Sequence, residues 1–360
     1  METKKLNEVA HNLYFSIAII KECNYKCGYC YPFGQNKSIG KNMSAEEFAS
    51  LIRAARDSGF NKFKITGGEP TIVGWLFSSI ETALVQYPEI NFTIITNGKN
   101  LLQHVDMLEA HKDRMSIQFS LDSVRDTAGK GLYKVLDAET RKTLTELSER
   151  GIKTRINMVL TQQNRGEVSD MIKLAANFGF SIKLFNLFIQ DEYIATNGVN
   201  GTIGKYSSLS PWEYWKANYV IPDDVLGAIG RDFEIEKVDA AHEEGLGSVQ
   251  HTVRANGVKV ILLNSSSGAF FNPEICIKNC PLFGKTCEKG MFNPMVSSNM
   301  VLHIDDCNNS THRWPLRGKT HDEMIVSIKE ILELFAAVKF VANPLPAYPE
   351  ASNVLNLEQQ

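Results

Sequence analysis

Short apolar runs and amphipathic stretches alternate along the first half of the chain. Runs rich in β-branched and aromatic residues predict six strands, at Leu13–Ile20, Lys62–Thr66, Asn91–Thr96, Met115–Leu121, Lys153–Leu160 and Ser181–Leu187. Apolar positions at helical spacing between them predict helices at Ser44–Ser58, Glu139–Glu149 and Val168–Phe178. Strands that alternate with helices indicate an α/β fold with a parallel sheet, and six such units predict a partial (β/α)6 barrel. Functional residues are then expected at the carboxyl ends of the strands.

The alternation ends after about residue 191. Residues 197–208 are rich in Gly, Ser, Thr and Asn, which is typical of a loop or linker. The remaining pattern predicts helices near Asp223–Ile229 and at Asp322–Ala337, and strands at Gly257–Leu263 and Pro294–His303. We therefore predict a barrel at residues 1–205, a smaller C-terminal α+β domain at 206–340 and a tail at 341–360.

The composition is that of an ordinary globular protein, with 43% hydrophobic and 22% charged residues. A net charge of -3, from 38 Lys+Arg and 41 Asp+Glu, gives no positive field for a nucleic-acid partner. The apolar run at Leu13–Ile20 is too short to span a bilayer and follows no basic signal-peptide region. We expect a cytoplasmic protein with no membrane partner.

The seven cysteines form two groups rather than a disulfide framework. Cys23, Cys27 and Cys30 have C-x3-C-x2-C spacing directly after the first predicted strand, with no fourth thiol nearby. A structural zinc site takes four ligands, whereas a four-iron cluster held by three cysteines leaves one iron open to a small molecule. Buried free thiols, and a zinc site completed by a distant residue such as His11, are the alternatives.

Polar and glycine residues follow the predicted strands. The second strand ends in Thr66-Gly67-Gly68-Glu69-Pro70, the third in Thr96-Asn97-Gly98, and the fourth in Ser120-Leu121-Asp122. Glycines let the backbone approach a ligand closely. These side chains would therefore surround the open end of the barrel.

The cysteine loop and the intact Gly-Gly-Glu-Pro motif resemble the radical S-adenosylmethionine (SAM) superfamily over residues 13–190, and Tyr29 matches its aromatic residue before the last cysteine. The resemblance implies a partial barrel and a [4Fe-4S] cluster on Cys23, Cys27 and Cys30, with SAM bound at the open iron. It implies reductive cleavage of SAM to a 5'-deoxyadenosyl radical that abstracts a substrate hydrogen, with electrons from a donor such as flavodoxin or ferredoxin. The expected cofactor contacts are Tyr29, Gly67, Gly68, Glu69, Thr96, Asn97, Ser120 and Asp122, the last two near the ribose.

The second cysteine group comprises Cys276, Cys280, Cys287 and Cys307, with C-x3-C-x6-C-x19-C spacing. Four thiols suit an auxiliary [4Fe-4S] cluster, a zinc site or structural roles. Residues 215–335 resemble the C-terminal part of the GTP 3',8-cyclases of molybdenum cofactor biosynthesis, whose layout the auxiliary-cluster "twitch" subdomain shares. By this resemblance Cys287 and Cys307 are auxiliary ligands, joined by Cys276, Cys280 or both.

Several features depart from the cyclases. The chain has four cysteines in place of three, longer gaps between them, no Gly-Gly-Arg terminus and no arginine in the approach Ile20-Lys21-Glu22. These differences argue against a triphosphate substrate and the cyclase reaction. The candidates for contacting an anionic substrate are Arg155, Arg254, Arg313 and Arg317, and the alternative is that they are ordinary surface or ion-paired arginines.

We expect an enzyme that acts on a small nucleotide-like or sugar-like molecule, assisted by the auxiliary cluster. A maturase of a ribosomally made peptide is the second hypothesis, and the expected lack of a leader-binding module before the first strand disfavours it. A non-catalytic metal-binding scaffold is the third. The pattern identifies no general acid or base.

Overall fold

The computed structural model describes residues 2–30, 41–125, 134–187, 214, 217–220, 222–238, 246–247, 250–263, 268–280, 283, 287, 290–305 and 312–342. Three sequence predictions fall wholly or mostly outside these residues. They are the linker at 197–208, the tail at 341–360 and the ligand Cys307.

Six neighbouring parallel strands form the barrel sheet, in the order β1-β2-β3-β4-β5-β6. Their bounds are β1 Phe15–Ala18, β2 Lys62–Thr66, β3 Asn91–Thr96, β4 Met115–Ser120, β5 Thr154–Val159 and β6 Ser181–Phe185. The partial (β/α)6 barrel is therefore confirmed. β2 and β3 have the predicted bounds, and the other four strands are shorter than predicted.

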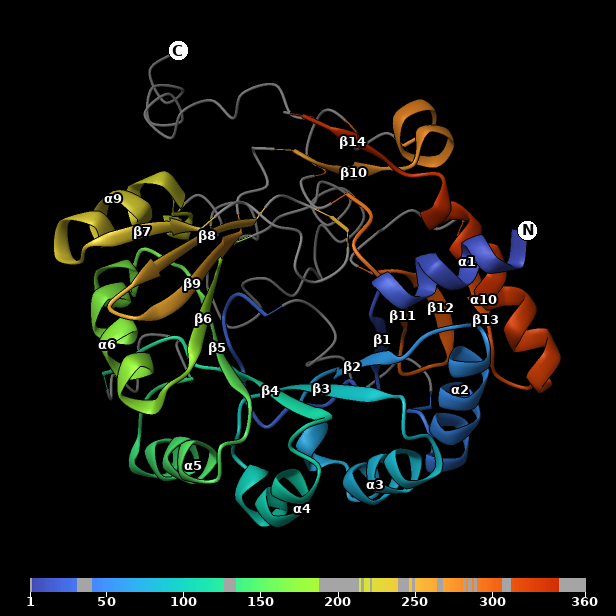
Figure 1. Cartoon of the computed structure of the whole chain (residues 1–360), viewed down its shortest axis with the longest axis horizontal. Coiled ribbons are helices and arrows are strands. Elements are labelled where there is room, and N and C mark those ends of the chain that lie inside the picture. Colours follow the sequence, from blue (N-terminus) through green and yellow to red (C-terminus); the bar gives the residue numbers. More distant parts are fainter. Residues whose placement is uncertain are drawn as a thin grey trace.

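Helices cover the outer face of this curved sheet (Figure 1). They are α2 Ala45–Asp57, α3 Leu76–Gln86, α4 Val105–Ala110, α5 Ala138–Glu149 and α6 Val168–Phe178, with short helices η2 Pro70–Ile72, η3 Leu101–His104 and η4 Arg165–Glu167. Ser44 and Glu47 form a capping box that begins α2. The outward-facing strand residues pack against the helices; Phe92 on β3 and Phe48 on α2, for example, have ring centroids 6.5 Å apart.

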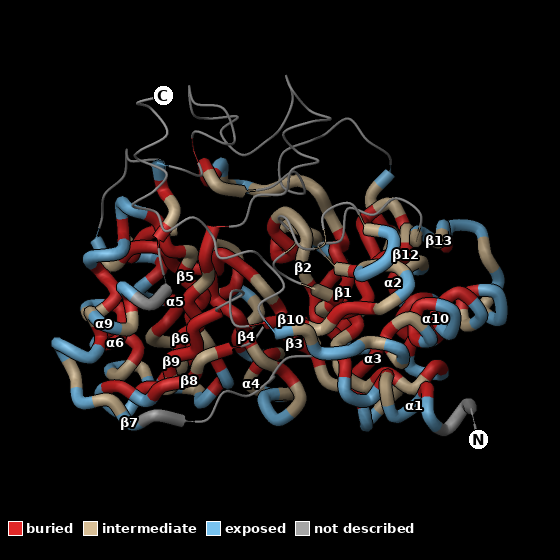
Figure 2. The backbone as a smooth tube through the Cα atoms, turned by 90° about the horizontal axis from the view of Figure 1, so that it is seen from above, coloured by how far each residue is buried: buried red, intermediate tan, exposed pale blue. Residues whose placement is uncertain are grey.

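The C-terminal region adds strands to both edges of the barrel sheet. β11 Pro294–Val296 pairs in parallel with β1 and continues into β12 Val301–Ile304 and β13 Arg313–Pro315. β9 Val258–Leu263 pairs in parallel with β6 and continues into β8 Gln250–Ala255 and β7 Ile235–Val238. The result is one twelve-stranded sheet, and its six barrel strands are largely buried in Figure 2.

The remaining elements pack around this sheet. α1 Glu2–Asn12 contacts α10 His321–Ala336, which also contacts α2, and α9 Pro222–Asp232 packs on α6. β10 Ala269–Phe271 and β14 Lys339–Val341 form a separate antiparallel pair, and η6 Pro273–Lys278 is a π-helix. Within the described part of the chain, no helix has the length and apolar character needed to cross a bilayer.

One predicted strand was wrong. Pro294–His303 is not a single strand but the antiparallel pair β11 and β12, joined by a tight turn. The turn is closed by the N–H of Met300 donating to the carbonyl of Ser297, and Met300 has a φ of 63°. A left-handed methionine is uncommon, and no glycine marks the reversal, so the pattern reads as continuous.

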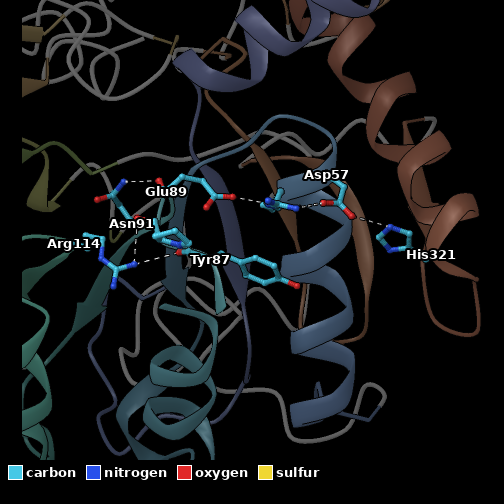
Figure 3. A network of polar contacts seen from close by, with 8 residues as sticks. Asp57, Tyr87, Glu89, Asn91, Arg114 and His321 are labelled. Carbon is cyan, nitrogen blue, oxygen red and sulfur yellow. Dashed lines mark hydrogen bonds and ion pairs between the residues drawn. The ribbon is translucent and has the colours of Figure 1, made fainter. Parts of the chain in front are cut away.

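A polar network ties α10 to α2 and to the start of β3 (Figure 3). His321 on α10 lies 3.1 Å from Asp57 at the end of α2. Arg56, also on α2, contacts Asp57 at 2.8 Å and Glu89 at 2.6 Å. Arg114 donates to the backbone carbonyl of Tyr87 beside this group. These contacts connect the C-terminal helix to the barrel, although partly exposed ion pairs contribute little stability individually.

Candidate functional site

The loop that carries Cys23, Cys27 and Cys30 leaves β1 and is held by backbone hydrogen bonds to the end of β2. The N–H of Ile19 donates to the carbonyl of Thr66 (3.0 Å), and the N–H of Gly68 donates to the carbonyl of Ile20 (2.7 Å). The N–H of Glu69 donates to the carbonyl of Glu22 (2.9 Å). The two sequence motifs are therefore one structural unit at the carboxyl end of the barrel.

Gly67 and Gly68 are required by this close contact. Gly67 has a φ of 141°, and a Cβ there would lie 2.4 Å from the carbonyl oxygen of Ile20. A Cβ on Gly68 would lie 1.9 Å from the carbonyl oxygen of Glu22. The glycines thus let the cysteine loop lie directly on the strand end, and their predicted contact with SAM stays a prediction.

Glu69 connects the carboxyl ends of β2 and β3 through hydrogen bonds. Its carboxylate is buried and accepts hydrogen bonds from the N–H and hydroxyl of Thr71, the hydroxyl of Thr96 (2.6 Å) and the N–H of Asn97 (2.7 Å). The side-chain amide of Asn97 in turn donates to Asn24 in the cysteine loop (2.7 Å). Glu69, Thr96 and Asn97 are therefore brought together at the site, and their hydrogen bonds fix the shape of the loop.

Tyr29 and Asp122 form a second attachment for the loop. The Tyr29 hydroxyl donates to one carboxylate oxygen of Asp122, and the N–H of Val159 donates to the other at 3.0 Å. Asp122 is fully buried, which raises its pKa, and burial beside Asp122 raises the pKa of Tyr29 well above its usual value. Asp122 thus faces the loop and β5, while its predicted position near a ribose stays a prediction.

The three thiols fit an iron–sulfur cluster by their donor chemistry. Burial raises the pKa of all three thiols, that of Cys27 to about 12. For each of them the charge of Lys134 acts in the opposite direction. Soft thiolates bind iron–sulfur clusters and zinc, and coordination supplies the positive charge that keeps buried sulfur deprotonated. His11 lies on α1, before β1, so it stands at the opposite end of the strand from the cysteines and does not complete a zinc site.

A cavity of about 320 Å³ occupies the barrel interior beside this loop and is called the barrel cavity below. Gly67 and Lys134 line it, as do polar residues from several strands: Ser16, Lys64, Gln118, Ser120, Asn157 and Lys183. Lys64 is 5% exposed and Lys183 is 2% exposed, and their ammonium groups lie 5.4 and 5.9 Å from the ring centroid of Phe292. The barrel is thus filled with polar and cationic groups, unlike the packed apolar interior of a closed eight-stranded barrel.

The structure separates the four candidate arginines. Arg155 on β5 donates to Asn157, which lines the barrel cavity. Arg254 faces Glu236 at 3.9 Å, Arg313 is exposed on β13, and Arg317 forms an ion pair with Glu47 at 2.7 Å. None of the four arginines is among the residues that line the barrel cavity, although Arg155 contacts one that is.

The second cysteine group is only partly described. Cys276 lies within η6, and the N–H of Cys280 donates to its carbonyl at 3.1 Å. Cys276, Cys280 and Cys287 are all partly exposed, and Cys307 lies outside the described residues. Among the described residues, no three His, Cys, Asp or Glu side chains are arranged to hold a single metal ion. The auxiliary cluster stays a prediction.

Sequence reasoning missed three lysines of the site. Lys64 could have been predicted, because it lies two residues before Thr66 on β2 and its side chain therefore points to the same face of the sheet, the barrel interior. Lys183 could be found in the same way along β6. Lys134 has no such signal, because it lies on none of the described strands or helices.

Comparison with known proteins decides the family of this domain. Residues 17–175 match the model of the radical SAM superfamily. The chain contains a radical SAM domain. A probable GTP 3',8-cyclase of Thermococcus kodakarensis is 29% identical over 186 residues, which cover 50% of this chain and 58% of that protein. The sporulation killing factor maturation protein SkfB of Bacillus subtilis is 25% identical over 169 residues, covering 46% and 40% of the two chains.

The chain therefore matches little more than half the length of the Thermococcus protein. Among solved structures, Streptococcus suis SuiB bound to SAM aligns with a TM-score of 0.55 at 18% identity, over 92% of this chain and 68% of that one. Native anSMEcpe with bound SAM and a Kp18Cys peptide gives a TM-score of 0.53 at 18% identity, over 90% and 83%. At this identity the two structures establish the fold, and they confirm the barrel.

Proposed function

We propose that the protein is a radical SAM enzyme whose first [4Fe-4S] cluster is bound by Cys23, Cys27 and Cys30. The observation that carries the proposal is the cysteine loop seated on Gly67 and Gly68 at the edge of a polar barrel cavity. When bound, the cluster and SAM supply a 5'-deoxyadenosyl radical that abstracts hydrogen from a substrate. The barrel then provides position and shields the reaction from solvent.

The residues of this chain have separable roles in that proposal. Glu69 holds the ends of β2 and β3 in register with the loop, and Asp122 holds Tyr29 next to Cys30. Ser120 and Gly67 lie on the cavity wall, between the loop and the substrate space. A donor such as flavodoxin or ferredoxin would deliver the electron, and Cys276, Cys280, Cys287 and Cys307 would bind an auxiliary [4Fe-4S] cluster.

A small anionic substrate, such as a nucleotide or sugar phosphate, is the substrate class that the barrel cavity favours. Lys64, Lys134 and Lys183 bring three positive charges to one cavity of about 320 Å³, against the single carboxylate of Asp305 among its lining residues. Buried ammonium groups are favourable beside anions. Relatives named GTP 3',8-cyclase agree with such a substrate. The match to the maturation protein SkfB supports the second candidate, a peptide maturase.

Iron content and SAM cleavage test the cofactor assignment. Anaerobically reconstituted protein should contain about eight irons per chain if both clusters form. Replacing Cys23, Cys27 and Cys30 by alanine should abolish cleavage of SAM by a chemical reductant and leave roughly half of the iron. Replacing the four later cysteines instead should leave the first cluster in place. Retained cleavage in the first triple variant would contradict the proposal.

Binding of defined probes tests the substrate class. GTP, a sugar phosphate and a short uncharged peptide would be titrated into the reconstituted protein with SAM present. Lys183→Met should weaken binding of the anionic probes at least tenfold, equal to about 1.4 kcal/mol. Lys112→Met, at the opposite end of β4, is the control with the same change in charge. Tight binding of the peptide alone would favour the maturase.

A further inference from the structure

Lys134 brings a positive charge to the cysteine loop from a part of the chain that carries none of the motifs. Its backbone carbonyl accepts hydrogen bonds from the N–H groups of Asp122 (2.7 Å) and Ser123 (3.2 Å), just beyond the end of β4. Its ammonium lies 5.3 Å from the ring centroid of Tyr29, and its side chain lines the barrel cavity with Gly67. The hydrogen bonds thus position the backbone of Lys134, and the contact with Tyr29 positions its ammonium group.

The charges around this ammonium come from the predicted cluster ligands. Burial lowers the pKa of Lys134, but the negative charges of Asp122 and of the three cysteine sulfurs raise it above its ordinary value. The hydroxyl of Tyr29, whose ring lies beside this ammonium, donates to the buried carboxylate of Asp122. Lys134 is therefore the cation that balances this group of acidic side chains.

Three other described lysines near the barrel opening have contacts of their own. Lys99 forms ion pairs with Asp137 at 2.6 Å and Glu139 at 2.9 Å, outside the barrel cavity. The ammonium groups of Lys64 and Lys183 lie against the ring of Phe292.

We propose that Lys134 is a charge-compensating residue of the first cluster site and that it raises the reduction potential of the cluster. This inference rests on the proposed function, because it requires the cluster on Cys23, Cys27 and Cys30. Adding one electron makes a thiolate-bound cluster more negative, and a fixed cation nearby stabilises the reduced form more than the oxidised form. In this partly buried site the effect is less screened than it would be on the surface. Lys134 thereby makes the cluster easier to reduce before SAM is cleaved.

The experiment measures the midpoint potential of the reconstituted full-length protein by redox titration with electron paramagnetic resonance detection. Lys134→Met is compared with Lys134→Arg, which keeps the charge, and with Lys112→Met, which removes an exposed lysine at the far end of β4. To isolate the first cluster, all variants carry alanine at Cys276, Cys280, Cys287 and Cys307. We expect a shift to more negative potential in Lys134→Met only. Potentials that agree among all four proteins, or an equal shift in Lys134→Met and Lys134→Arg, would overturn the inference.

Two further outcomes separate this inference from the proposed function. If Lys134→Met keeps its far-ultraviolet circular dichroism but loses iron while Lys134→Arg retains it, the charge is needed to hold the cluster and the inference stands. If both variants lose iron, the shape of the side chain rather than its charge matters, and the inference fails. A parent protein that binds no cluster overturns the proposed function and the inference together, whereas a parent that cleaves SAM with an unshifted Lys134→Met overturns the inference alone.

Discussion

Gly68 is the residue at which the cysteine loop depends most on the absence of a side chain. Gly68→Ala would place a Cβ 1.9 Å from the carbonyl oxygen of Glu22, so either the strand end or the loop must move. We expect a loss of about 1–3 kcal/mol in the free energy of unfolding, as for other overpacked sites, together with reduced iron content. Urea unfolding and iron analysis measure both effects. Gly74→Ala, where a Cβ meets nothing within 4 Å, is the control and should match the parent protein.

Tyr29 is the second residue whose contribution can be isolated. Tyr29→Phe removes the hydroxyl that donates to the buried carboxylate of Asp122 and leaves one oxygen of that carboxylate without this donor. We expect a cost of about 1–3 kcal/mol, and a further rise in the pKa of Asp122. Chemical denaturation of the apoprotein measures the cost. Tyr87→Phe is the control, since the contact of Tyr87 with Arg114 uses its backbone carbonyl. Equal stability of the two variants would contradict this role for Tyr29.

The ion pair between Glu47 on α2 and Arg317 in the C-terminal region should depend on pH. Arg317 holds the pKa of Glu47 below its usual range, with a contribution from the hydrogen bond donated by the N–H of Ser44. A lowered folded-state pKa means that this stabilisation is present above the ordinary pKa of glutamate and is lost as the pH falls. Because both side chains are partly exposed, Glu47→Gln should cost no more than about 1 kcal/mol near neutral pH.

The comparison of Glu47→Gln with the parent protein at pH 6.5 and near pH 3.5 measures this dependence through the thermal midpoint. The difference between the two proteins should shrink at the lower pH. Glu149→Gln on the exposed face of α5 is the control with the same change in charge and should show no such trend. If the difference between the two thermal midpoints instead grew at the lower pH, the ion pair would not stabilise the folded protein as proposed.

The elements that the sequence predicts well are those in which one local rule acts alone. β2 alternates lysines with Phe63 and Ile65, β3 is rich in β-branched and aromatic residues, and α6 ends at Gly179 in a left-handed conformation, so their bounds follow from local pattern. At the β11–β12 turn Met300 adopts a positive φ without glycine. The short polar run at residues 297–299 is the only local signal of that turn.

Some parts of the candidate site could be predicted from the sequence and others could not. The cysteines lie in one short motif and the glycines in another, at the ends of neighbouring strands, so their proximity could be predicted. The contacts of Tyr29 with Asp122, and of Lys134 with Tyr29, join segments that are about a hundred residues apart in sequence. Such pairs depend on the curvature of the sheet, which brings the end of β4 next to the loop after β1. Local periodicity contains no information about that curvature.

At the scale of the whole molecule, the C-terminal region protects the barrel by pairing with both of its edges. β1 pairs with β11 and β6 pairs with β9, so neither outer barrel strand is an open edge in the full chain. The predicted domain boundary near residue 205 divides the sequence, yet strands from both sides of that position share one sheet. The predicted domains are therefore joined through backbone hydrogen bonds as well as side-chain packing.

Truncation tests this dependence. A protein of residues 1–187 retains β1 to β6 but exposes the backbone of two mostly buried strands, β1 and β6. Unpaired apolar edges promote association between chains, so we expect the fragment to aggregate or to elute as large oligomers in size-exclusion chromatography. The full chain, purified in parallel, is the control. A monomeric fragment that unfolds cooperatively would mean that the barrel edges are stable without the C-terminal strands, because their own twist and short length already limit pairing.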